Sequence, residues 1–389
     1  MAIPIQYNIR NVLQRPVATF TTALGIGLTV MIFIGALALA AGFSAALRST
    51  GSPENAIVLR KGADSEISSG IGRDAMNVIR AHPAVATGPD GHPLVTSDLV
   101  VVINKDRVGQ KGSSNVSLRG VDPNGVGVRA HLRIVGGRMF APGTDEVIVG
   151  RRVASRFASM RIGDPIQFQQ RTFKVVGHFE AEGSAFESEI WGDAAVLGPA
   201  LDREGTFQTI TFRMKDPAQF DAVKRELEAD PRLQVQVKRE RDFYAEQSAL
   251  FAGLITGLGI FITSIMAVGA IFGAANTMYA TIGSRTREIA TLLVLGFRPG
   301  AVMISFMIES VFISMLGGLI GCLLALPMNG IATSTTNFQS FSEIGFAFKI
   351  TPEALISGLV FSAIMGLLGG FFPARRAAKQ QLATALRGG

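Results

Sequence analysis

The chain is poor in charged residues, cysteine and histidine, and each shortage argues against a class of protein. Charged residues make up 17% of its 389 residues, whereas an average soluble protein has about 25%. The single cysteine, Cys322, has no partner for a disulfide or a CxxC metal site. The histidines form no HExxH motif, which argues against metal catalysis; they are His82, His92, His131 and His178.

A phosphate-binding loop is also missing. The glycine-rich pieces "GIGLTV" and "SGIGRD" lack the lysine and the strand–loop–helix context of a nucleotide site. A net charge of +7 would suit nucleic-acid binding, but Lys and Arg gather at the ends of apolar runs and form no aromatic-interleaved patch. We therefore predict no nucleic-acid partner, no metal, no directly bound cofactor and no catalysis by this chain.

Long apolar runs are what the sequence has in abundance. Hydrophobic residues make up 48% of the chain, and four runs are long enough to cross a bilayer as helices. Their only interior acidic residue is Glu309. The first run contains "ALALAAGFSA", which resembles a signal peptide, but it is far longer than a signal h-region, so an uncleaved anchor is favoured. The predicted transmembrane helices are 17–42, 249–280, 301–326 and 353–372.

The basic residues that flank these runs predict the orientation. They precede the first run, lie between the second and third, and follow the fourth, whereas the connection between the third and fourth carries only Lys349. The positive-inside rule then places both termini in the cytoplasm of a multi-pass membrane protein, and the family resemblance given below implies the bacterial inner membrane. The flanking segments are a cytoplasmic amphipathic lead (1–16), a cytoplasmic loop (281–300), a short extracytoplasmic loop (327–352) and a cytoplasmic tail (373–389).

Residues 43–248 form a large insert between the first two runs, predicted to be an extracytoplasmic (periplasmic) α+β domain. Helical patterns occur near 68–81 and over 217–230. The segment 183–193, "GSAFESEIWGD", is predicted to be a lobe junction or surface loop, although Trp191 itself is best taken as a core residue. Strand-like runs separated by Gly, Pro and Asp occur at 56–60, 99–103, 146–150, 166–169, 173–179, 209–214 and 235–238.

The cytoplasmic loop contains the signals of a short amphipathic helix over 284–295. Ser284 is a candidate N-cap, Gly296 stands at the C′ position, and Pro299 stops continuation. Arg285 and Glu288 have the spacing to pair on one helix face. The alternative is ordinary positive-inside flanking that only sets topology.

Small residues and one carboxylate mark the interiors of the runs. Glycines four residues apart predict close helix packing; they are Gly317, Gly321, Gly366 and Gly370. Glu309 is costly in lipid unless it faces the protein interior. It is either a structural or coupling residue, with Asn276, Thr277 or Ser305 as candidate partners, or part of a proton relay. A lone intramembrane carboxylate makes a poor relay.

Three segments resemble the permease subunits of MacB/FtsX-type (mechanotransmission) ABC transporters. They are "NIRNVLQRPVATFTTALGIGLTV", "SRTREIATLLVLGFRPGAVMISFMIESVFISMLGGLIG" and "GGFFPARRAAKQQLATALRG". The resemblance covers the membrane half by sequence and the insert only by position and size. It implies that 281–300 holds the coupling helix and that this helix docks on a separate ATPase subunit. The implied contacts are Ser284, Arg285, Arg287, Glu288 and Ile289.

The resemblance also implies partners and a mechanism. ATP and Mg would be used by the partner ATPase, and this chain would pair with a second permease, identical or paralogous. A periplasmic adaptor with an outer-membrane channel, or a lipoprotein, would complete the assembly. The expected function is export, extrusion, or lipoprotein or lipid release by motion of the periplasmic domain. The alternative is a membrane-anchored sensor or scaffold whose extracytoplasmic domain binds a ligand or partner without transport.

Overall fold

The computed structural model describes residues 15–379 except 110, 130 and 170, so the predicted lead and the end of the tail lie outside the described residues. The chain divides into two compact units. The helical unit comprises the chain up to Gly42, Gly253–Ile331 and the chain from Phe348 onward. The α+β unit comprises Phe43–Ala252 and Ala332–Ala347.

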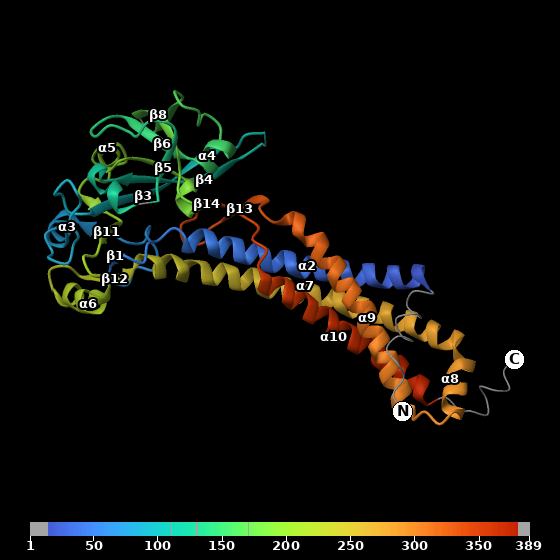
Figure 1. Cartoon of the computed structure of the whole chain (residues 1–389). Coiled ribbons are helices and arrows are strands. Elements are labelled where there is room, and N and C mark those ends of the chain that lie inside the picture. The colour runs from blue at the N-terminus through green and yellow to red at the C-terminus, as the bar shows by residue number, and fades with distance from the viewer. Residues whose placement is uncertain (1–14, 110, 130, 170, 380–389) are drawn as a thin grey trace. The chain divides into compact units, whose positions relative to one another are not determined.

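Four long apolar helices cross or enter the helical unit (Figure 1). They are α2 (Pro16–Arg48), α7 (Glu240–Ser284), α9 (Pro299–Ala325) and α10 (Pro352–Ala378), and all four are long and apolar enough to span a membrane. Proline stands at the first helical position of α9 and α10, where no backbone N–H is needed. The hydroxyl of Thr351 caps α10 by accepting from the Ala354 N–H at 3.2 Å. The predicted architecture of four transmembrane helices is confirmed.

Glycines let these helices approach closely. A Cβ on Gly321 would lie 2.6 Å from the Gly27 carbonyl oxygen, and one on Gly317 would lie 2.6 Å from that of Ala23, so both sit in the α2–α9 contact. Gly366 and Gly370 face Ser314 and Ser310 in the α9–α10 contact. By contrast, added Cβ atoms would meet nothing within 4 Å at Gly253, Gly257, Gly269 and Gly273 of α7.

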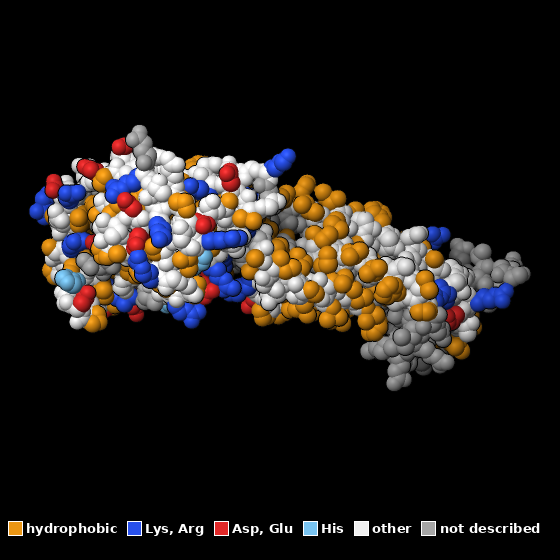
Figure 2. Space-filling model, turned by 90° about the horizontal axis from the view of Figure 1, so that it is seen from above, with side chains coloured by type: hydrophobic (Ala, Val, Ile, Leu, Met, Phe, Trp, Pro, Cys, Tyr) orange, Lys and Arg blue, Asp and Glu red, His pale blue; other side chains and the backbone are white. Residues whose placement is uncertain are grey.

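Many large apolar side chains are exposed on the helical unit, and they gather on the face of it that Figure 2 shows. Large side chains such as Leu258, Phe261 and Phe272 of α7 are exposed. Lipid tails accept such a surface, whereas water does not. The exposed surface therefore fits a unit embedded in a bilayer.

The α+β unit is built on a ten-stranded mixed sheet in the order β12-β1-β11-β3-β4-β9-β6-β8-β5, with β7 paired to β8. The pairs β4–β9 and β6–β8 are parallel, and the others are antiparallel. Its strands are β1 (Asn55–Arg60), β3 (Val95–Asp106), β4 (Ser113–Val121), β5 (Arg133–Gly137), β6 (Glu146–Gly150), β7 (Pro165–Phe168), β8 (Arg171–Glu180), β9 (Glu189–Asp193), β11 (Thr209–Arg213) and β12 (Val235–Arg239), and a separate pair is β2 (Ile71–Gly72) with β10 (Thr206–Phe207).

Two hydrophobic cores lie on this sheet. The first core joins β12, β1 and β11 to α3 (Arg73–Arg80) and α6 (Phe220–Ala229). The second joins β4, β6, β8 and β9 to α4 (Arg151–Arg156) and α5 (Ala194–Ala200). The unit is therefore a two-lobed α+β domain, as the sequence predicts.

The segment 183–193 corrects one expectation. It is not a surface loop, because Ser184 to Asp193 are buried; a 3₁₀ turn, η2 (Ala185–Ser188), is followed by the interior strand β9. Trp191 is fully buried against Phe179 and Phe186, so its prediction as a core residue is confirmed. The buried glutamates of this segment have ionic partners, which is why a polar-looking sequence occupies the interior.

The connection between α9 and α10 also differs from the expected simple loop. It contains an antiparallel β-hairpin, β13 (Ala332–Thr336) and β14 (Glu343–Ala347), in which Thr333 opposes Phe346. Residues 332–347, called the hairpin below, belong to the α+β unit. The polar run "ATSTT" gives little sign of a strand, so the sequence analysis missed it.

Candidate functional site

The amphipathic helix predicted for the loop 281–300 is present as α8 (Thr286–Val294). Gly296 ends it with φ +90°; its N–H donates to the Leu293 carbonyl, and the Phe297 N–H donates to the Leu292 carbonyl. This is the Schellman arrangement expected of a C′ glycine. The N-cap prediction for Ser284 is wrong because α7 continues to Ser284. Its hydroxyl donates to the Thr281 carbonyl instead, at 2.8 Å.

A buried ion pair joins α8 to α9. The Arg285 guanidinium lies 2.8 Å from the Glu288 carboxylate, as predicted, and 3.2 Å from the Glu309 carboxylate. It also covers the Phe306 ring at 5.5 Å. Arg285 and Glu309 are only 9% and 4% exposed. Glu309 therefore pairs with a cation from the loop, a partner that the sequence analysis did not name.

The five residues predicted to contact an ATPase divide between two faces of this corner. Ser284, Arg287 and Glu288 are exposed. Arg285 points into the ion pair, and Ile289 is buried in a cluster with Met278, Ile282, Val302, Phe306, Ala374 and Ala377. The outward three form a small polar surface, and the inward two attach that surface to α7, α9 and α10.

A second group of charges lies buried in the α+β unit. The Arg119 guanidinium donates to Glu66 at 2.9 Å, to Asp98 at 2.9 Å and to Glu189 at 2.7 Å. It is 1% exposed. Burial by itself would lower the pKa of Arg119, but the charges of Glu189 and Glu66 outweigh it and raise that pKa well above its usual value. Arg119 therefore stays charged and holds β3, β4, β9 and the β1–β2 connection together.

Arg129 extends this network to the first residue of α7. Its guanidinium donates to Asp98 at 2.8 Å and to Glu240. The second Glu240 oxygen accepts from the Ser52 N–H at 3.0 Å and from the Asn55 side-chain amide at 2.8 Å. Because Ser52 follows the end of α2 closely, one carboxylate fixes both long helices where they join the α+β unit.

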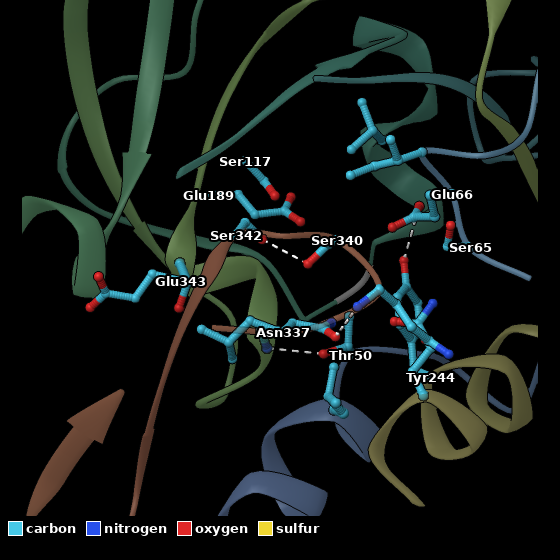
Figure 3. Close-up of a pocket in the computed structure, with 18 residues that line it drawn as sticks. Thr50, Ser65, Glu66, Ser117, Glu189, Tyr244, Asn337, Ser340, Ser342 and Glu343 are labelled. Carbon is cyan, nitrogen blue, oxygen red and sulfur yellow. Dashed lines mark hydrogen bonds between the residues drawn. The ribbon is translucent and has the colours of Figure 1, made fainter. Parts of the chain in front are cut away.

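Figure 3 shows a small polar pocket in the same unit, lined by side chains that include Thr50, Glu66, Tyr244, Asn337 and Ser342. Its free volume is about 30 Å³, enough for about two water molecules. A cavity of this size has room for water but is too small for an organic ligand. Within the described part of the chain, no group of three His, Cys, Asp or Glu is arranged to hold a metal ion.

Comparisons with known proteins cover both halves of the chain. Residues 19–230 match the MacB-like periplasmic core domain, and residues 259–382 match the FtsX-like permease C-terminal domain. An uncharacterized ABC transporter permease of Methanocaldococcus jannaschii is 25% identical over 59% of this chain and 58% of its own length. A macrolide export ATP-binding/permease protein MacB of Aeromonas hydrophila is 26% identical over 79% of this chain and 48% of its own.

Two solved structures match about half of the chain. The periplasmic region of MacB from Actinobacillus actinomycetemcomitans covers 50% of this chain and 92% of its own, at 13% identity and a TM-score of 0.38. The extracellular domain of the Gram-positive transporter YknZ covers 47% of this chain and 99% of its own, at 14% identity and a TM-score of 0.36. The chain spans about half the length of the curated relatives named above.

Proposed function

Because the chain belongs to the MacB/FtsX-type family of ABC transporter permeases, we propose that it couples ATP hydrolysis by a separate ATPase subunit to motion of its extracytoplasmic α+β unit. The motion would serve export, extrusion, or lipoprotein or lipid release. ATP and Mg would be used only by the partner. A second permease copy or paralogue would complete the membrane part of the assembly.

The observation that carries the proposal is the buried ion pair between Arg285 of the α8 corner and Glu309 of α9. A partner that pushes on the exposed Ser284, Arg287 and Glu288 moves α8. Since Arg285 is anchored to Glu309, and Ile289 to the cluster around it, α9 must follow. The corner is thus attached to the membrane helices by contacts stiff enough to pass on a displacement.

Two further features support transmission to the α+β unit. Helices α2 and α7 each contribute residues to both units without a break in the helix. Glu240 then ties the start of α7 to the segment after α2. A helix shift of an ångström or two can be carried along such elements without new chemistry.

The test is ATP turnover by the partner ATPase in nanodiscs that contain the full chain. Wild-type chain should stimulate turnover, and Arg287→Glu and Glu288→Lys should each reduce the stimulation at least tenfold. Charge reversals at exposed positions of the α+β unit, Arg161→Glu and Glu204→Lys, are the matched controls and should leave it unchanged. Full stimulation by both α8 variants would refute docking at α8. A chain that binds no ATPase would instead support the sensor or scaffold alternative.

The proposed orientation, with both termini and α8 in the cytoplasm, has its own test. In a Cys322→Ala background, a cysteine placed at Glu226 should react with an impermeant maleimide from outside intact cells. One placed at Arg287 should react only after permeabilisation. The opposite labelling pattern would show that the topology is the reverse of the one proposed.

A further inference from the structure

The hairpin connects α9 to α10 in sequence but forms part of the α+β unit. Its two strands pair with each other as a separate two-stranded sheet and are not strands of the ten-stranded sheet. No sheet continuity therefore fixes it to that unit. Side-chain contacts must do so.

The central contact is an ion pair between a buried carboxylate and two half-buried arginines. Glu343 of β14 is 4% exposed. One of its carboxylate oxygens lies 2.8 Å from the Arg156 guanidinium, and the other pairs with Arg107. Arg156 ends α4 and Arg107 follows β3. One hairpin carboxylate thus binds two separate elements of the lobe that contains the second core.

Hydrogen bonds on either side of this pair extend the attachment. The Asn115 amide donates to the Phe341 carbonyl at 2.9 Å, and the Gly345 N–H donates to the Ser188 hydroxyl at 2.9 Å. Arg152 of α4 donates to the Gly345 carbonyl. The hairpin is therefore held along its length by partners from β4, η2 and α4.

Aromatic contacts join the hairpin to the outer ends of the two long helices. Phe346 meets Phe43 of α2 with ring centroids 5.4 Å apart, and Phe338 meets Phe251 of α7 at 5.8 Å. The hairpin thereby touches both helices and the second-core lobe at once. A displacement of α2, of α7 or of this lobe is therefore transmitted through the hairpin to the other two.

The hairpin faces the rest of the unit mainly with polar side chains. Figure 3 shows Asn337, Ser340 and Ser342 on the same small pocket as Glu66 and Glu189. Only Ile344 and Phe346 supply buried large apolar side chains from the hairpin strands. Attachment consequently depends on polar contacts, among which Glu343 supplies the one buried carboxylate of the hairpin strands.

We propose that the hairpin is a third mechanical tie between the transmembrane helices and the α+β unit, with Glu343 as its positioning residue. This rests on the proposed function and deepens it. Helices α2 and α7 carry motion into the unit where they join it, and the hairpin carries motion of the α9–α10 pair directly to α4 and the end of β3. The second-core lobe then receives motion by a route additional to the sheet that it shares with the first-core lobe.

The first arm of the test asks whether Glu343 fixes the hairpin. Hydrogen exchange of the full chain in nanodiscs should show at least tenfold faster exchange over 332–347 in Glu343→Ala than in wild type. Arg107→Ala with Arg156→Ala should give the same result from the other side of the pair. Glu204→Ala is the matched exposed control and should change nothing. If hydrogen exchange over 332–347 is unchanged both in Glu343→Ala and in Arg107→Ala with Arg156→Ala, the proposal that this ion pair fixes the hairpin is wrong.

The second arm asks whether the tie transmits. With the ATPase present, trapping with ATP and vanadate should change exchange over α4 at least twofold in wild type. That response should be lost in Glu343→Ala, while ATPase stimulation through α8 persists. A freed hairpin with a retained α4 response would refute transmission. If the wild-type chain does not stimulate the ATPase, the proposed function is wrong but the attachment of the hairpin is not affected. The first arm tests that attachment without the ATPase.

Discussion

Removing either side of the Arg285–Glu309 pair should have unequal effects on stability. Arg285→Ala leaves the Glu309 carboxylate, 4% exposed, without its guanidinium. Uncompensated buried charges of this kind cost about 3–5 kcal/mol. Glu309→Ala is milder because Arg285 keeps the Glu288 carboxylate at 2.8 Å, so about 2 kcal/mol is expected for a partly retained pair.

The double variant makes the reasoning quantitative. Since Arg285→Ala/Glu309→Ala leaves neither charge buried, its destabilisation should fall short of the sum of the single effects by about 1–3 kcal/mol. Thr291→Ala is a control within α8, because its hydroxyl donates only to the Arg287 carbonyl of the same helix, at 3.0 Å. That change should remain within about 0.5 kcal/mol.

The assay is reversible unfolding of the full chain in mild detergent at neutral pH, with wild type, the two single variants, the double variant and the Thr291→Ala control measured side by side. Strict additivity of the two single effects would show that the two charges do not interact. It would also remove the anchor through which α8 is proposed to move α9.

Three other outcomes follow from contacts described above. Gly321→Ala should destabilise the chain by about 1–3 kcal/mol through overpacking, because the new Cβ would lie 2.6 Å from the Gly27 carbonyl oxygen. Gly257→Ala is the control and should leave the stability unchanged, because its new Cβ meets nothing within 4 Å. Equal melting temperatures of the two variants would contradict the α2–α9 contact. Burial favours the neutral acid at Glu343, but hydrogen bonds from Ser334 and Ser114 and the charges of Arg156 and Arg107 outweigh it, so its pKa lies below the ordinary 4.5. The stability that its charge supplies is therefore present above about pH 4.5 and lost as the pH falls through the lowered pKa, and the difference in melting temperature between wild type and Glu343→Gln should shrink over that range; a difference independent of pH would exclude the charge as its source. Ala245→Pro breaks α7 six residues from its start at a local cost of about 3 kcal/mol, and should abolish the vanadate-dependent exchange changes in the α+β unit while ATPase stimulation remains; a retained response would place transmission elsewhere.

The features that could be predicted from the sequence are those that depend on residues close to one another along the chain. Uninterrupted apolar runs predict the four membrane helices because a bilayer sets their length. Gly296 predicts the end of α8 because few other residues adopt φ near +90°. Seven strands of the large sheet were found from short β-branched runs between turns. In each case the signal lies within one continuous segment of the chain.

The features that were missed depend on contacts between distant residues. Arg285 and Glu309 are 24 residues apart and belong to different helices. Arg119 reaches Glu66, 53 residues earlier, and Glu189, 70 residues later. The segment "GSAFESEIWGD" looked like a surface because it carries two glutamates. No local pattern shows that the guanidinium groups of Arg152 in α4 and Arg119 in β4 neutralise them in the interior.

The discontinuity of the α+β unit sets an order for its synthesis. Its first segment ends at Ala252, and the unit is complete only after Ala347 has been made. That interval of about 95 residues takes about 5–20 s at ordinary translation rates of about 5–20 residues per second. During this interval Arg107 and Arg156 lack their partner Glu343. Helix α9 must insert into the membrane before the hairpin can reach them. The last step in maturation of the domain is therefore governed by membrane insertion of a helix outside it. Substitutions that delay insertion of α9 should expose the domain to proteolysis even though none of its own residues has changed.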